Sequence, residues 1–449
     1  MVRRLQSAVC DSFAKSRRKL DKARAAIYNG CKAEPQGSAG WKRRSAAKAE
    51  RVRPEEMGME YKRSHRFVCA LCALALVLTA LLPTAAFAEE PAVPQAAAQS
   101  LTAADVREMQ QADTAVTDLT ESADYAQMSE DERTAAALQQ LDALTAQGLV
   151  KNGSVYVDAE NGMVSFSYSC GALGGILLTD PEEETAAPEM DLPQLTASLA
   201  EENKRVGSAA IYYAFDNTVN STRYPYYAYM QTYWDSVGLQ TELDTTVTVS
   251  DLRKMGRYDV CILSTHGAYY TYEYGWLFKK TATEPLLLLT ERSDFWSDFR
   301  YGFDLLTHRV IKVNGMYAVN GSFFRSAYRG NGIVLSETCE FYGKNGHWSN
   351  SVADGLLAGG AKAVMGYVNN VYSVYSRSML WATVNRMIEG ETLEQAVDYA
   401  KSIYGSDDII WYNQQGGRRP HAAAAYAVLS GSRSAMLPNP YTAEEAAAA

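Results

Sequence analysis

Two apolar runs in the C-terminal half of the chain each lead into a residue type that can carry catalysis. Residues 260–264 precede the pair His266-Gly267, and residues 333–336 are followed three positions later by Cys339. Short apolar runs rich in β-branched residues and bounded by polar positions predict buried strands of a parallel sheet. Neighbouring parallel strands end at one edge of the sheet, and ligands bind at that edge in open α/β sheets. We therefore expect His266 and Cys339 to meet there.

A histidine beside a cysteine is the minimum arrangement for catalysis by a thiol nucleophile. The imidazole of His266 would take the thiol proton of Cys339 and later serve as the acid for the leaving amine. Gly267 has no side chain, so a substrate carbonyl could approach its backbone closely. The N–H groups of Gly267 and Cys339 would then form an oxyanion hole. Either residue alone is more often structural, whereas the two strand ends together are far more specific.

Strands and helices alternate along residues 194–440, which we interpret as one α/β domain. Besides the two catalytic runs, strands are predicted at 209–215, 241–249, 363–367 and 423–430. Helices are predicted at 226–237, 251–255, 351–361, 376–389 and 393–404. Such alternation predicts a mostly parallel sheet covered on both faces. Residues 268–331 are expected to form a long connection.

The preceding residues 89–193 are interpreted as a small α+β accessory or pro-segment. Helical patterns fill residues 101–147, notably 129–147, and residues 148–178 alternate as strands. Asn152-Gly153 and Asn161-Gly162 within that stretch are strong hairpin signals. Residues 179–193 are acidic and contain prolines, as expected of a linker.

Residues 57–88 have the plan of a secretory signal peptide. Lys62, Arg63 and Arg66 precede an apolar run over residues 67–82, and Ala86-Phe87-Ala88 provides an A-x-A cleavage site. The predicted mature chain starts at Glu89 and is secreted or attached to a bacterial cell envelope, touching the membrane only transiently. An uncleaved signal anchor is the alternative. Residues 1–56 are interpreted as an upstream over-extension, and residues 441–449 as a disordered tail.

Composition excludes some classes of function. Residues 89–449 hold 25 Lys and Arg against 45 Asp and Glu, a balance of −20, which argues against a nucleic-acid partner. Only Cys170, Cys261 and Cys339 remain after signal cleavage, and three cysteines make no disulfide framework. Cys261 lies inside a strand and is expected to be inert.

Four stretches of sequence carry a resemblance to a known superfamily: Ile262-Leu263-Ser264-Thr265-His266-Gly267, Val334-Leu335-Ser336-Glu337-Thr338-Cys339, residues 351–357 with 360–366, and Leu429-Ser430-Gly431. The segment from Ala209 to about Leu437 resembles the caspase/gingipain superfamily of cysteine peptidases, which includes clostripain, legumain, separase, metacaspases and CHAT-domain proteases. The resemblance implies a three-layer αβα caspase-like fold. It also implies an endopeptidase that cleaves protein or peptide substrates with His266 as base and Cys339 as nucleophile.

The same resemblance bears on specificity. In this superfamily the residue two before the nucleophile often lines the S1 pocket, and an acid there or after the first strand often accompanies a basic P1 residue. Glu337 and Asp216 hold those positions, so cleavage after Arg or Lys is expected. Alternatively, both acids are solvated or pair with protein cations such as Arg325 or Arg329. The sequence departs from the family at Thr338 and in the bulky stretch that follows Cys339.

Other candidates rank lower. His347 is expected on a loop surface, and His308 and His421 show no metal-ligand spacing, so neither a metal nor another cofactor is predicted; a calcium requirement is left open. Trp411-Tyr412 is expected to pack in the core, although it could wall a subsite. Self-cleavage at Lys279-Lys280 is a further alternative. Two rival functions also stay open: a non-catalytic caspase-like binding module, and a sortase-like thiol acyltransferase of the cell surface.

Overall fold

The structure is a computed structural model, and it describes residues 100–179, 204–215, 226–274, 279–414 and 420–442. All of these belong to one compact unit, Glu89–Ala449. The predicted signal peptide over 57–88, the upstream residues 1–56, most of the linker and Asp216 lie outside the described residues. Tyr441, expected in the disordered tail, is instead buried, and its N–H donates to the carbonyl of Ile388.

A six-stranded sheet carries the predicted site. In spatial order its strands are β5 (Leu239–Asp244), β4 (Gly207–Ala214), β6 (Val260–Thr265), β11 (Ile333–Ser336), β14 (Ala363–Val368) and β15 (Tyr426–Gly431). The first five are mutually parallel, and β15 runs antiparallel to β14. Every residue of β6, β11 and β14 is buried, as expected for strands covered on both faces. The predicted α/β class with a mostly parallel sheet is confirmed.

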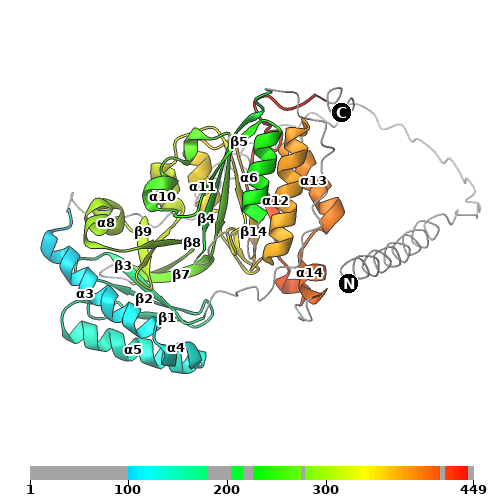
Figure 1. The fold of residues 1–449 in the computed structure, drawn as a ribbon. Helices are drawn as coiled ribbons and strands as arrows, with labels where there is room; N and C mark the ends of the chain where they lie inside the picture. The colour runs from blue at the N-terminus through cyan, green and yellow to red at the C-terminus, as the bar shows by residue number, and fades with distance from the viewer. Residues whose placement is uncertain (1–99, 180–203, 216–225, 275–278, 415–419, 443–449) are drawn as a thin grey trace, which may run out of the picture. The chain divides into compact units, whose positions relative to one another are not determined.

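Helices pack on both faces of this sheet (Figure 1). One face is covered by α6 (Tyr226–Ser236), α12 (Ser373–Ile388) and α13 (Leu393–Tyr404), and the other by α7 (Val249–Leu252), α10 (Gly321–Ala327) and α11 (Ser351–Ala358). The side chains of consecutive strand residues reach opposite cores, Ile262 with the first group and Leu263 with the second. Two short 3₁₀ helices, Met255–Arg257 and His421–Ala423, and α14 (Ile409–Gln414) complete this part of the fold.

Residues 268–331, expected as a connection, instead supply most of four of the seven strands of a second sheet. They contain β7 (Gly267–Tyr274), β8 (Lys280–Arg292), α8 (Phe295–Arg300), α9 (Gly302–Leu306), β9 (Val310–Val313) and β10 (Met316–Val319), besides α10. The other strands of this sheet are β1 (Tyr156–Asp158), β2 (Met163–Ser167) and β3 (Leu173–Leu177), in the order β1-β2-β3-β9-β10-β8-β7. The expected accessory segment therefore shares a sheet with the chain between His266 and Cys339.

Among the residues that the structure describes, three helices precede that sheet in the chain: α3 (Ala103–Thr120), α4 (Ala123–Gln127) and α5 (Glu130–Ala146). Ser129 and Glu132 form a capping box at the start of α5, which confirms the helix predicted at 129–147. Asn161-Gly162 connects β1 to β2 in a hairpin, but Asn152-Gly153 only makes a turn before β1. No helix among the described residues is both long and apolar enough to cross a membrane.

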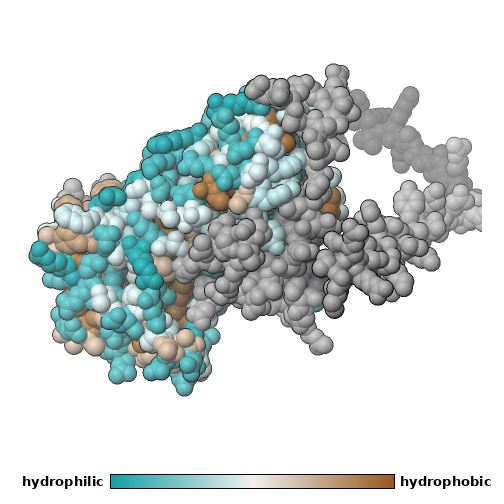
Figure 2. Space-filling view, viewed as in Figure 1, coloured by the Kyte–Doolittle hydropathy of each residue, from teal (hydrophilic) through white to brown (hydrophobic). Residues whose placement is uncertain are grey.

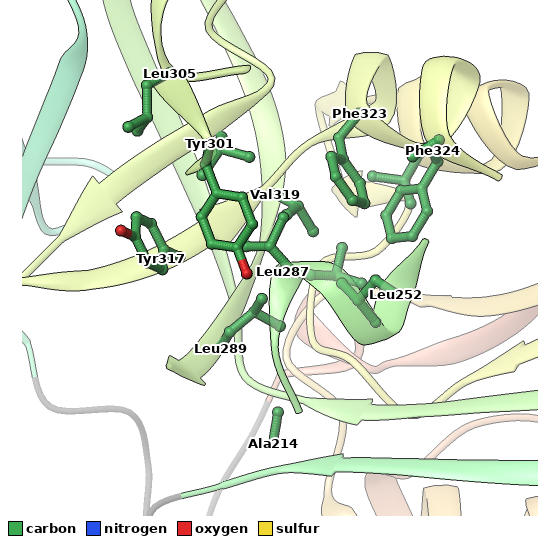
Figure 3. Close-up of a cluster of buried hydrophobic side chains, with 14 of the residues drawn as sticks. Ala214, Leu252, Leu287, Leu289, Tyr301, Leu305, Tyr317, Val319, Phe323 and Phe324 are labelled. Carbon is green, nitrogen blue, oxygen red and sulfur yellow. The ribbon is translucent and has the colours of Figure 1, made fainter. Parts of the chain in front are cut away.

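The two sheets share one hydrophobic core (Figure 3). Leu252 from α7, Leu287 from β8, Tyr301 between α8 and α9, and Phe323 from α10 pack within a single buried cluster. That cluster continues to apolar residues of α3 and α5 such as Met109. The N-terminal helices therefore share a hydrophobic core with one face of the six-stranded sheet.

A buried ion group adds a polar connection between these parts. The Lys312 side chain, on β9, is fully buried, and its Nζ lies 2.7 Å from Oδ2 of Asp298 on α8. The same Nζ also contacts the carboxylate of Asp113 on α3. Burial raises the pKa of Asp298, and the positive charge of Lys312 opposes that shift. One cation thus contacts carboxylates from two different helices.

The first prediction concerns this ion group. Lys312→Met keeps the apolar stem but leaves two carboxylates buried without their cation, so the free energy of unfolding should fall by about 3–5 kcal/mol. Lys279→Met is the matched control, because the Lys279 ion pair with Glu273 is largely exposed and is worth about 1 kcal/mol or less. Urea denaturation of both variants measures the difference. Equal losses in the two variants would show that the buried group does not hold the N-terminal helices in place.

Candidate active site

The ends of β6 and β11 bring His266 and Cys339 to the same level of the sheet. Ser336 is paired with Leu263 in the parallel register, and the N–H of Glu337 donates to the carbonyl of Leu263 at 2.9 Å. Three residues further along each strand, the same register places Cys339 beside His266. Thr265 and Thr338, one step earlier, confirm that the strands stay adjacent, because their hydroxyl oxygens are 3.0 Å apart.

Gly267 touches the backbone of Cys339. A Cβ atom built on Gly267 would stand 1.9 Å from the carbonyl oxygen of Cys339 and 2.7 Å from Cγ2 of Thr338. Only glycine allows the two strand ends to approach this closely. The expected reason for this glycine was access for a substrate carbonyl; in the structure, the space is taken by the Cys339 peptide itself.

The N–H of Gly267 is directed away from the β7–β8 ladder. The carbonyl of His266 accepts a hydrogen bond from the N–H of Leu288 at 2.9 Å, and Gly267 faces Leu287. In an antiparallel pair this makes Gly267 and Leu287 a non-hydrogen-bonded pair, whose N–H groups point outward from the ladder. That orientation suits the expected role of Gly267 as an oxyanion donor.

Residues from the strands on either side complete the surroundings of the dyad. The ring of Phe215, which follows β4, meets the His266 ring edge-on, with centroids 4.5 Å apart. On the other side, the Cys339 thiol lies 3.7 Å from the carbonyl oxygen of Val371, which follows β14. His266 and Cys339 are both partly exposed. Four neighbouring parallel strands thus contribute to one edge, next to the point where the strand order reverses between β4 and β6.

The turn after Cys339 holds a strained backbone. Glu340 has φ of 54° and Asn369, after β14, has φ of 64°, a region that non-glycine residues rarely adopt. The two turns support each other, because the N–H of Glu340 donates to the carbonyl of Asn369 at 2.9 Å and the N–H of Asn369 donates to the carbonyl of Gly343 at 2.8 Å. Strain of this kind is concentrated at functional sites.

The bulky residues that follow Cys339 point into the core. Phe341 is 1% exposed and packs against Gly366 of β14. Tyr342 is fully buried, and its hydroxyl donates to the hydroxyl of Ser430 at 2.8 Å. The departure from the family pattern after Cys339 therefore fills the interior beneath the turn, without covering the thiol.

Glu337 lies beneath the surface of the site. It is 6% exposed, and its Oε2 accepts a hydrogen bond from the Tyr227 hydroxyl on α6 at 2.8 Å. Burial raises the pKa of Tyr227 well above its ordinary value, and the nearby carboxylate of Glu337 adds to the shift. The buried guanidinium of Arg377 lies over the Tyr227 ring, 5.8 Å from its centroid. Sequence reasoning missed Tyr227 and Arg377, because nothing local links α6 and α12 to the Cys339 strand.

The alternative partners suggested for Glu337 lie elsewhere. Arg325 and Arg329 are exposed, on α10 and just after it, and Arg329 donates to the backbone carbonyls of Arg325 and Tyr328. Asp216, the second expected specificity residue, is outside the described residues.

The lower-ranked candidates stay apart from the dyad chemistry. His347 is exposed on a short hairpin of β12 (Gly343–Lys344) and β13 (His347–Trp348), as expected of a surface residue. Burial lowers the pKa of His308, which hydrogen-bonds the Gly171 carbonyl. Burial raises the pKa of the Cys261 thiol, so this cysteine is protonated and inert at neutral pH.

Trp411 is partly buried against the core and donates to the Tyr404 carbonyl at 2.9 Å. Lys279 pairs with Glu273, and Lys280 begins β8. Within the described ranges, no group of three or more His, Cys, Asp or Glu side chains could hold a metal ion.

The second prediction tests the Gly267–Cys339 contact. Gly267→Ala should force the two strand ends about 1 Å apart and slow alkylation of Cys339 by a peptide acyloxymethylketone by about a hundredfold. Gly207→Ala in β4 is the control, because its nearest neighbours would be side-chain atoms 3.3 Å away. The reaction is followed by mass spectrometry of the Cys339 peptide. Unchanged labelling in Gly267→Ala would mean that this contact does not position the thiol.

Comparison with protein-family models finds none that matches the chain, and comparison with curated proteins finds no significant match.

Proposed function

We propose that this protein is an exported cysteine endopeptidase that hydrolyses peptide bonds through a His266/Cys339 dyad. The observation that carries the proposal is the contact between Gly267 and the Cys339 carbonyl, together with the register that sets His266 and Cys339 side by side. A histidine and a partly exposed thiol at one carboxyl edge of a parallel sheet are the parts that acyl transfer requires.

The mechanism follows from the positions of these groups. His266 accepts the thiol proton, and the Cys339 sulfur attacks the substrate carbonyl carbon. The negative oxygen that develops is stabilised by N–H groups, of which Gly267 supplies one that points away from its own ladder. His266 then protonates the leaving amine, and water hydrolyses the thioester with His266 again acting as base. Phe215 restrains the imidazole ring by its edge-on contact.

Several features support a caspase-like architecture for residues 194–440. Five parallel strands and a reversed sixth strand are covered by helices on both faces. The sequence stretches that resemble the superfamily fall on β6, β11, β14 and β15 of this one sheet and on α11, which covers one of its faces. The same arrangement disfavours a sortase-like acyltransferase, whose fold is built from β-strands. The inward-facing Phe341 and Tyr342 disfavour a binding module with a blocked cleft.

The substrate class that we propose is a peptide with Arg or Lys at P1. The Glu337 carboxylate lies two residues before the nucleophile and is only 6% exposed, so a long cationic side chain suits it better than a short one. An acidic P1 side chain would be repelled. The Tyr227 hydroxyl holds one carboxylate oxygen, so the carboxylate is oriented before substrate arrives.

The N-terminal segment is proposed to remain with the enzyme as a structural support. Its strands share the second sheet, and Asp113 of α3 contacts the buried Lys312. If the segment were a removable inhibitor, the remaining sheet and core would have to stay intact after its removal. Secretion to the cell envelope is proposed from the signal sequence alone; the three described cysteines form no disulfide.

The third prediction tests the dyad. Cys339→Ala and His266→Ala should each abolish hydrolysis of fluorogenic peptides, and His266→Ala should also suppress labelling of Cys339 by an acyloxymethylketone. Cys170→Ala is the matched control for a second partly buried thiol and should keep full activity. Activity that survives in Cys339→Ala would overturn the proposal.

The fourth prediction tests specificity. Glu337→Gln removes the charge without changing the size, and should lower kcat/KM for Arg and Lys substrates about 10–100-fold relative to Asn substrates. Tyr227→Phe, which removes only the hydroxyl, should give a smaller loss in the same ratio. Amidomethylcoumarin peptides with Arg, Lys, Asn or Asp at P1 measure these ratios. A preference of the parent enzyme for Asp would contradict the assignment of Glu337.

A further inference from the structure

Three aromatic side chains project from the surface of α8 and α9. Trp296, Phe299 and Phe303 are 73%, 54% and 59% exposed, although aromatic side chains of this size are usually buried. Their spacing of three and four residues places them along one side of consecutive helical turns. In Figure 2, tan and brown atoms interrupt the hydrophilic surface near the end of the molecule where Figure 1 labels α8. We call these three residues the aromatic ridge.

Arginine side chains flank the aromatic ridge. Arg292 and Arg300 are exposed, and the partly exposed Arg309 places its guanidinium 5.2 Å from the Phe303 ring centroid. The acids of α8 and α9 are turned inward: Asp298 contacts Lys312, and Asp304 contacts Arg253. Of the outward acids, Asp294 accepts hydrogen bonds from the backbone at the start of α8, and Glu121 pairs with Arg292. Arg309 also lies 3.9 Å from Asp304, so the arginines beside the ridge are interspersed with carboxylates that are already paired.

The chain enters the fold beside the ridge. Leu101 packs against Gly302 in α9, where an added Cβ would stand 3.3 Å from it. The apolar run at residues 67–82 precedes Leu101 by fewer than twenty residues in sequence. While the apolar run is in a membrane, the first described residues of the chain are close to it in sequence. These residues pack against α9, which carries exposed aromatic and cationic side chains beside it.

We infer that the aromatic ridge is a docking surface for an anionic lipid bilayer. Trp and Phe side chains enter the interface between headgroups and acyl chains, while arginines at the margin contact lipid phosphates. Arg292 and Arg300 supply that margin. Binding of this kind is peripheral and reversible, and it is independent of peptidase activity. It would hold the catalytic sheet at the cell surface after signal cleavage.

The test uses the chain from Glu89 onward, which contains every described residue and forms one compact unit. The protein is sedimented with vesicles of phosphatidylcholine, with and without phosphatidylglycerol, at low and at physiological salt. We expect binding to the anionic vesicles that weakens with salt. The variant Trp296→Ser/Phe299→Ser/Phe303→Ser should lose affinity about tenfold or more. The control Ile403→Ser/Ile410→Ser removes exposed apolar side chains from α13 and α14 and should bind as the parent does.

A second variant keeps the inference testable even if the triple serine variant does not fold. Arg292→Gln/Arg300→Gln changes only exposed side chains, and should reduce both the binding and its salt dependence. Hydrolysis of a soluble peptide should be unchanged in every variant, which separates this inference from the proposed dyad. Absence of vesicle binding by the parent, or equal binding by all variants, would overturn the inference. So would ridge-dependent dimerisation in sedimentation velocity without vesicle binding, which would assign the ridge to a second copy of the chain.

Discussion

The close approach of two strand ends, at Gly267 and Cys339, is the constraint on which the rest of this structure depends. The contact leaves no room for a side chain at position 267, because a Cβ would stand 1.9 Å from the Cys339 carbonyl oxygen. It determines how near the imidazole and the thiol lie, and it also directs the chain out of the catalytic sheet. The residue after His266 already begins β7 of the second sheet. Gly267 therefore both holds the ends of β6 and β11 close together and begins the second sheet.

That connection explains why the N-terminal segment belongs to the same folded unit as the proposed dyad. The strand that leaves the dyad pairs with β8, and the sheet continues through β10 and β9 to the hairpin strands before residue 180. Lys312 and the shared apolar core join α3 and α8 to the same sheet. A displacement of the N-terminal helices would be transmitted to β7 and hence to His266. Stability of the second sheet and geometry of the dyad are for this reason coupled in our account.

Local patterns predicted the catalytic sheet well. The apolar runs at 260–264 and 363–367, the capped helix at 393–404 and the last strand, predicted at 423–430, are all signals within a few residues of sequence, and each element is present. The strand predicted at 241–249 ends early, at Asp244, because Thr248 caps α7 instead. The helical and strand periodicity of the sequence was sufficient to predict that His266 and Cys339 lie at one edge of the sheet.

The second sheet could not be predicted in the same way. Its pairing of β3 with β9 joins segments that are far apart in sequence, and no local pattern encodes such a register. The environment of Glu337 could not be predicted for the same reason, since Tyr227 contacts it from α6 and Arg377 of α12 lies over the Tyr227 ring. The strained turn at Glu340 also depends on a distant residue, Asn369. Long-range contacts decide these features.

The most direct measurement is the mass of the enzyme during a single turnover. An activated ester of a short Arg-containing peptide is mixed with the chain, and the reaction is quenched in acid within the first turnover. Our account predicts a peptidyl thioester on Cys339 that forms and decays in the parent and does not accumulate in His266→Ala. A peptide adduct on Cys170, or formation on Cys339 at the same rate without His266, would contradict it.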